Sequence, residues 1–120
     1  LAHRVLEALG HGSTVRTYLH GRDAAHWLVS LLRHGEPGEI YNVGSDVPVS
    51  ILELAQAVAT QASPPLGIRV LKTAASGRRA TYLPSIEKAG RLGLRVETPL
   101  HEAIVTTLRA LEGAPSIPAV

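Results

Sequence analysis

The fold is decided by one stretch, residues 39–54, in which an apolar strand-like segment leads through a short loop into a helix. It reads Glu39-Ile40-Tyr41-Asn42-Val43-Gly44-Ser45-Asp46-Val47-Pro48-Val49-Ser50-Ile51-Leu52-Glu53-Leu54. Ile40, Tyr41 and Val43 favour a buried strand, and Gly44 can take the positive φ that ends one. A strand, a loop and a helix in this order predict a unit of an α/β protein.

The helix of this unit has a clear start signal. Ser50 and Glu53 stand three residues apart and form a capping box, in which each side chain satisfies a backbone N–H at the helix start. The residues that follow place an apolar stripe on one helical face; these are Ile51, Leu54, Ala55, Val58 and Ala59. In open α/β folds the loop before such a helix lies where ligands bind.

Composition limits the possible functions. A chain of 120 residues makes one domain, and the absence of cysteine rules out disulfides and thiolate sites. The absence of cysteine fits a reducing compartment, so we expect a cytoplasmic protein. No apolar run approaches the roughly 18 residues of a membrane span. The net charge is +2, and a nucleic-acid binder would need a denser basic stripe or stacking aromatics, so we expect neither membrane nor nucleic acid as a partner.

The remaining elements follow from apolar periodicity, glycine and proline. Trp27 is expected in the core, and Asp23 as a helix N-cap or as an acidic residue in the first turn, where the helix dipole stabilises it. We expect the following elements: a helix over residues 1–10 ending at Gly10, a strand over 15–20, a helix from Arg22 to about His34, a turn over 35–38, a strand over 68–71, a mobile loop over 72–80, an extended segment over 81–84, a short helix capped by Ser85 and ended by Gly93, a helix beginning at Pro99, and a tail over 113–120.

Several segments together resemble one family, the NAD-dependent epimerases and dehydratases, which are extended short-chain dehydrogenases acting on nucleotide sugars. The similar segments are Arg16 to Asp23, Gly35 to Ser45 with its Tyr-Asn-Val-Gly-Ser, Ser-Ile-x-Glu-Leu from Ser50, Ser85 to Leu94, and Leu100 to Arg109. The resemblance implies the C-terminal, substrate-binding portion of a Rossmann-like α/β fold, with short strands and about five helices. Residues 1–112 would be this portion and residues 113–120 a C-terminal tail.

The resemblance also shows what this sequence lacks. In the family an N-terminal half binds NAD and carries a Tyr-x-x-x-Lys pair, but here the residues four positions after Tyr18, Tyr41 and Tyr82 are not lysine. No Gly-x-x-Gly-x-x-Gly occurs either. We therefore expect NAD in the full-length relatives and none on this chain alone, which would be inactive unless it is part of a longer enzyme. The family also has a further strand before the Arg16 strand, where only residues 10–14 intervene here.

The candidate site follows from the charge of the expected ligand. A nucleotide diphosphate is anionic, and arginines clamp phosphate with charge-assisted hydrogen bonds. By the resemblance, Arg16 and either Arg78 or Arg79 contact the diphosphate, and Asn42 contacts the substrate unless it serves the strand end. We expect no catalytic residue here. No metal site is expected, because no two of the six histidines stand with a carboxylate at a known ligand spacing.

The parent reaction implied by the resemblance begins with oxidation of the sugar at C4 by bound NAD. Hydride then returns to the opposite face, or water is eliminated and hydride returns at C6. The partner would be the missing N-terminal Rossmann half or a second copy. The alternative is a non-catalytic module that binds a nucleotide or a protein with the same fold. The enzyme hypothesis requires the Asn42 segment to be a strand and Arg16 to face the arginine pair Arg78 and Arg79.

Overall fold

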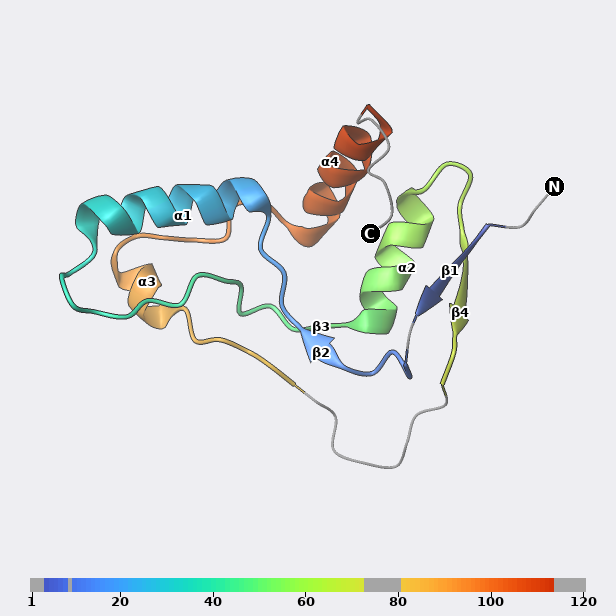
Figure 1. The fold of residues 1–120 in the computed structure, drawn as a ribbon, viewed down its shortest axis with the longest axis horizontal. Coiled ribbons are helices and arrows are strands. Elements are labelled where there is room, and N and C mark those ends of the chain that lie inside the picture. The colour runs from blue at the N-terminus through green and yellow to red at the C-terminus, as the bar shows by residue number, and fades with distance from the viewer. Residues whose placement is uncertain (1–3, 9, 73–80, 114–120) are drawn as a thin grey trace, which may run out of the picture.

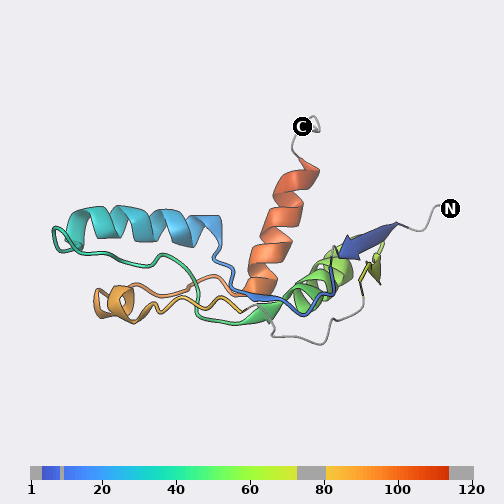
Figure 2. The same ribbon diagram turned by 60° about the horizontal axis from the view of Figure 1, so that its bottom comes forward.

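The computed structural model describes residues 4–8, 10–72 and 81–113, and within them the chain forms four helices and four short strands. In chain order these are β1 (Val5–Ala8), β2 (Val15–Arg16), α1 (Gly21–His34), β3 (Val49–Ser50), α2 (Ile51–Gln61), β4 (Gly67–Val70), α3 (Glu87–Arg91) and α4 (Leu100–Glu112). Figure 1 shows α1 and α3 at one end, and α2 beside β1 and β4 at the other. In Figure 2, α4 rises from the middle of the molecule.

The first sheet joins β1 and β4 in parallel, with Val5 opposite Gly67 and Ala8 opposite Val70. Ala8 is buried, as are Ala55 and Ala59 of the neighbouring α2. Side chains alternate between the faces of a strand, so Glu7 and its partner Arg69 share the other face. There the Arg69 Nη1 atom lies 3.3 Å from Glu7 Oε1. The sheet is therefore apolar toward α2 and charged on its outer face.

The helix predicted for residues 1–10 is wrong, because Val5–Ala8 is a strand. A short apolar run does not separate helix from strand, and the partner strand lies more than fifty residues further along the chain. Gly10 does break the element, with φ of 101°, but it follows a strand instead of capping a helix. A strand, residues 5–8, therefore precedes the Arg16 strand, where the sequence predicted none.

The second sheet is antiparallel and places Arg16. Val15 pairs with Ser50 and Arg16 with Val49, and Thr81 forms a parallel bridge to Val15 on the other side of β2. Only residues 15–16 of the strand predicted over 15–20 are paired. The chain from Tyr18 to His20 runs on as a connection into α1.

The strand predicted for Ile40 to Val43 is also wrong, because these residues belong to no described strand. A strand needs a partner, and the segment is held by side chains instead. The Tyr41 hydroxyl accepts from the Glu36 N–H at 3.1 Å, and Asn42 Nδ2 donates to the Ser85 carbonyl at 2.9 Å. This result counts against the enzyme hypothesis as stated above.

Gly44 does not end a strand through a positive φ, because its φ is not positive. A glycine is needed here for a different reason, since an added Cβ would lie 3.3 Å from Cγ of Pro84. The glycine thus permits the segment over residues 42–45 to approach the segment that precedes α3.

The largest buried side chain is Trp27 of α1, which is 0% exposed and packs with Ala89 and Leu94. Its indole Nε1 donates to the Arg95 carbonyl at 3.0 Å. This confirms the prediction that Trp27 belongs to the core.

The helix α3 is followed by a turn at Gly93, whose φ is 84°. The Leu94 N–H donates to the Ala89 carbonyl, so the helix ends in a turn that depends on glycine.

The cap predicted at Ser85 is wrong, and of the two roles predicted for Asp23 the structure shows the first-turn acid and not the N-cap. The N-cap of α1 is His20, whose imidazole accepts from the Arg22 N–H, while the Asp23 side chain reaches a distant segment. Ser85 does not cap α3, because the N-cap is Ile86 and makes no side-chain bond. The capping box at Ser50 is present in full, however, and α4 begins directly after Pro99 as predicted.

The chain is more extended and more exposed than a compact domain of its size. Its radius of gyration is 17.2 Å, whereas a compact domain of this length has about 14 Å. Its accessible surface is 9038 Å², against about 6200 Å² for a folded monomer of this mass. Several large apolar side chains are exposed, among them Leu28, Leu32 and Ile40. None of the described helices is long and apolar enough to cross a membrane.

Candidate functional site

The candidate site is a hollow of about 270 Å³ at the centre of the molecule. Three segments that are far apart in the sequence meet there: β2 with the residues after it, the segment before β3, and the segment before α3. The lining residues are Arg16, Thr17, Leu19, Asn42, Val43, Gly44, Ser45, Tyr82 and Pro84. The hollow therefore combines one cation with neutral polar and apolar groups.

Arg16 is fixed in the hollow by its place in the second sheet. The strand β2 is held by β3 on one side and by Thr81 on the other. The Val15 carbonyl accepts from Arg16 Nη1 at 2.9 Å and from the Tyr82 N–H at 3.3 Å. The guanidinium thus lies against the backbone next to Tyr82. A planar guanidinium with several donors suits recognition of a phosphate.

Asn42 lies in the same hollow, on the segment opposite β2. Its Nδ2 donates to the Ser85 carbonyl at 2.9 Å, which ties two of the three lining segments together. An amide also carries a carbonyl oxygen that can accept from a sugar hydroxyl. Asn42 therefore shapes the hollow whether or not it touches a ligand.

The structure brings Arg16 and Asn42 together, and Arg78 and Arg79 lie outside the described residues. The prediction that Arg16 faces this arginine pair stays a prediction. Sequence reasoning missed Tyr82 as a lining residue, although the resemblance already placed the second arginine close to it. The signal that identifies Tyr82 is the bridge between Val15 and Thr81, which only the structure reveals.

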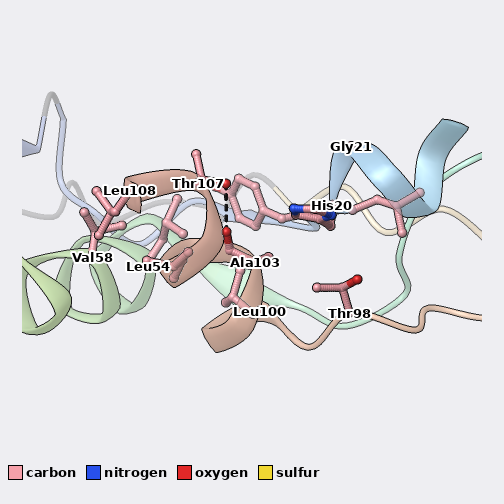
Figure 3. Close-up of a pocket in the computed structure, with 12 residues that line it drawn as sticks. His20, Gly21, Leu54, Val58, Thr98, Leu100, Ala103, Thr107 and Leu108 are labelled. Atoms are coloured by element: carbon pink, nitrogen blue, oxygen red, sulfur yellow. Dashed lines mark hydrogen bonds between the residues drawn. The ribbon is translucent and has the colours of Figure 1, made fainter. Parts of the chain in front are cut away.

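A second cavity of about 420 Å³ lies between α2, α4 and the connection into α1, and is lined mostly by apolar side chains such as Leu54, Val58 and Leu108 (Figure 3). Its two threonines already have partners. The Thr107 hydroxyl donates to the Ala103 carbonyl at 2.7 Å, and the Thr98 hydroxyl donates to Asp23 at 2.8 Å. This cavity therefore suits apolar contact and not a diphosphate.

Asp23 joins the start of α1 to the residues just before α4. Its carboxylate is 3% exposed and accepts from the Glu97 and Thr98 N–H groups at 2.9 and 2.8 Å. Burial raises the pKa of Asp23, but hydrogen bonds from the Thr98 backbone, the Thr98 hydroxyl and the Glu97 backbone outweigh it and lower the pKa below its ordinary value of 3.8. His20 contributes in the same direction. Asp23 is thus a structural anion with no open side for a reacting group.

Some of the other charged groups in the described residues form pairs at the surface. Lys88 pairs with Glu39, which lowers the pKa of that carboxyl, and Lys88 also lies 4.9 Å from the Tyr41 ring centre. In the capping box, the bonds from the backbone and hydroxyl of Ser50 lower the pKa of Glu53. Within residues 4–8, 10–72 and 81–113, no three histidine or acidic side chains come together as a metal site would require.

Comparison with known proteins adds the family context. No model of a known protein family matches the sequence. The dTDP-D-glucose 4,6-dehydratase of Bos taurus is 38% identical over 47 residues, which make up 39% of this chain and 13% of the bovine protein. The similarity in sequence thus covers less than half of this chain and a small part of its relative.

The likeness in structure covers most of the chain. RMD from Pseudomonas aeruginosa, complexed with NADPH, superposes with a TM-score of 0.75 and 28% identity over 90% of this chain and 36% of that one. UDP-glucose 4-epimerase from Bifidobacterium longum, complexed with NAD+ and UDP, gives a TM-score of 0.68 and 25% identity over 85% of this chain and 33% of that one.

The chain thus spans about a third of these solved proteins, which bind NAD+ or NADPH in their full length. The described residues have helices and short strands in the same arrangement as the matched part of each. The resemblance to the NAD-dependent epimerase/dehydratase family is thereby confirmed, and the chain has the α/β fold of part of an extended short-chain dehydrogenase.

Proposed function

We propose that residues 1–112 are the nucleotide-sugar-binding part of an NAD-dependent sugar epimerase or 4,6-dehydratase, with residues 113–120 as a tail. The observation that carries the proposal is that Arg16 and Asn42, the two described residues that the family resemblance implies as substrate contacts, line one hollow although 26 positions separate them. Arg16 would bind the diphosphate, and Asn42 would position the segment that faces the sugar. Arg78 and Arg79 remain proposed contacts of the same diphosphate.

The chain by itself does not fit NAD. Its sequence has neither the Gly-x-x-Gly-x-x-Gly that brings backbone N–H groups to a dinucleotide phosphate nor a Tyr-x-x-x-Lys pair. In the family, bound NAD takes hydride from C4 of the sugar and returns it. This chain's residues would contribute only binding and orientation, which lower the barrier by holding the sugar in place.

The redox part would dock on the outer face of α1, defined by Leu28, Val29 and Leu32. These side chains are 59%, 49% and 87% exposed, although Leu31 of the same helix packs against the Trp27 core. Ile40, in the segment that follows α1, is 83% exposed. A contiguous exposed apolar face is typical of a surface at which another part of a protein binds. A second copy of this chain is the other occupant of this face.

Isothermal titration calorimetry tests the binding proposal. We expect the chain to bind uridine or thymidine diphosphate sugars weakly, and Arg16→Ala to abolish the binding. Arg33→Ala is the matched control, since Arg33 lies in the last turn of α1 outside the hollow. Binding that Arg16→Ala leaves unchanged would refute the role of Arg16. No binding by the parent chain would refute the claim that these residues hold the diphosphate by themselves.

A second test separates the enzyme part from the non-catalytic alternative. The full coding sequence beyond the printed residues should encode a Gly-x-x-Gly-x-x-Gly and a Tyr-x-x-x-Lys if the chain belongs to an active enzyme. Their absence from that gene would leave the non-catalytic nucleotide- or protein-binding module as the function.

A further inference from the structure

The bridge between Val15 and Thr81 fixes the relation of two side chains in the hollow. The two residues are partners in a parallel pair. Because side chains alternate across a strand, the next residues on each side, Arg16 and Tyr82, project together to the opposite face. Both line the hollow of about 270 Å³. A cation and an aromatic ring therefore stand next to each other on one wall.

The Tyr82 side chain is more exposed and has fewer contacts than the side chain of Tyr41. It is 64% exposed, whereas the Tyr41 hydroxyl bonds the Glu36 N–H and the Tyr41 ring lies beneath Lys88. Among the described residues, no hydrogen bond or ring contact of the Tyr82 side chain occurs. The ring is held in position by its backbone, through the N–H bond to the Val15 carbonyl at 3.3 Å.

The size of the hollow limits what it holds. Pockets that enclose a whole small-molecule ligand have about 300–1000 Å³, so this hollow takes only one portion of a nucleotide sugar. An arginine beside an open ring matches the junction between a phosphate and a flat heterocycle. Aromatic side chains bind bases by stacking, because every base has a π-face.

Resting on the function proposed above, we propose that Tyr82 is the surface on which the heterocyclic base of the nucleotide stacks, while Arg16 binds the adjoining phosphate. Tyr82 is then a residue that selects nucleotide over simple phosphate ligands. Loss of one such stacking contact weakens binding on the order of tenfold.

The test compares two probes, inorganic pyrophosphate and UDP, by calorimetry on the whole chain and its variants. We expect Tyr82→Leu to weaken UDP on the order of tenfold and to leave pyrophosphate unchanged. Tyr82→Phe should keep the affinity for UDP, because it keeps the ring. Arg16→Ala should weaken both probes. Leu83→Ala is the control, since Leu83 is exposed beside Tyr82 but does not line the hollow.

Any other result contradicts the stacking proposal, and the pattern of affinities shows which role Tyr82 has instead. Unchanged UDP affinity in Tyr82→Leu removes the stacking role, and an equal loss for pyrophosphate means that Tyr82 supports Arg16 and not the base. If Tyr82→Leu leaves UDP unchanged but weakens UDP-glucose, titrated as a third probe, the ring contacts the sugar and not the base. In these cases, binding that still depends on Arg16 leaves the proposed function intact. A parent chain that binds neither UDP nor pyrophosphate refutes the stacking role of Tyr82 and the claim that these residues hold the diphosphate by themselves.

Discussion

Replacing Asp23 with alanine should destabilise the chain more than any other single change of a charged side chain in the described region. Asp23 accepts three hydrogen bonds, from the Glu97 N–H and from the N–H and hydroxyl of Thr98. All three donors lie more than seventy positions away in the sequence. This one carboxylate therefore fastens the start of α1 to the residues that lead into α4.

The magnitude follows from the groups left behind. Hydrogen bonds to a charged group contribute about 1.5–3 kcal/mol each, and their losses are not additive. Thr98 is 4% exposed, so its donors find little water in Asp23→Ala. We expect a loss of about 3–5 kcal/mol, a large part of the roughly 5–15 kcal/mol that stabilises a domain. Asp23→Asn should lose about 1–2 kcal/mol, because an amide keeps the backbone bonds and donates to the Thr98 hydroxyl.

Urea unfolding followed by the fluorescence of Trp27 measures these losses, since Trp27 is the single tryptophan and lies fully buried one turn further along α1. Asp46→Ala is the control at an exposed carboxyl and should change the free energy of unfolding by less than about 0.5 kcal/mol. A loss in Asp23→Ala no larger than in Asp46→Ala would refute the structural role of Asp23.

The pH dependence gives a second measurement of the same carboxylate. The pKa of Asp23 is lower in the folded chain than its ordinary 3.8, so the folded state favours the ionised form. Its contribution is present above pH 3.8 and is lost as the pH falls through the lowered pKa. The stability difference between the parent chain and Asp23→Asn should therefore shrink as the pH falls below about 4. A difference that grows with acid contradicts the lowered pKa.

Three further predictions use the same urea assay. Ser50→Ala should cost about 1 kcal/mol through loss of the capping box, and Ser50→Gly only a few tenths; equal costs would argue against the cap. Gly93→Ala should destabilise by about 1 kcal/mol, because Gly93 has φ of 84°, whereas Gly90→Ala inside α3 should stabilise by about 0.5–1 kcal/mol; effects of the same sign would contradict this. Leu31→Ala should cost about 2 kcal/mol and Leu32→Ala almost nothing, since Leu32 is 87% exposed; a large loss at Leu32 would show that it is covered.

The sequence predicted best those features whose cause is local. The capping box spans four residues and is present, and Pro99, Gly93 and the turn after α1 all mark boundaries as expected. In each case the deciding hydrogen bonds join residues within one or two turns. The local sequence therefore contains all the information that is needed to predict such a feature.

The predictions that failed concern features that depend on residues distant in the sequence. Val5–Ala8 is a strand because β4 lies beside it, and no local pattern reveals that partner. Asp23 was expected as a cap or a first-turn acid, because these are the usual roles of an aspartate at a helix start. Its partner Thr98 is 75 positions away, so its true role was invisible. In the site, the resemblance supplied Arg16 and Asn42, whereas Tyr82 emerged only from the bridge beside β2.

The failed strand at Ile40 to Val43 has a cause of a different kind. Its residues have strand propensity, but the described chain offers them no partner, and Ile40 is left 83% exposed. The same end of the molecule exposes Leu28 and Leu32. Under the proposed function both features have one explanation, because the sheet that would pair the segment and cover α1 belongs to the redox part. Under this proposal, the exposed apolar side chains of α1 and of residues 40–43 would contact residues outside this chain. Supplying that part should protect the backbone N–H groups of residues 40–43 from hydrogen exchange, and unchanged exchange would contradict this explanation.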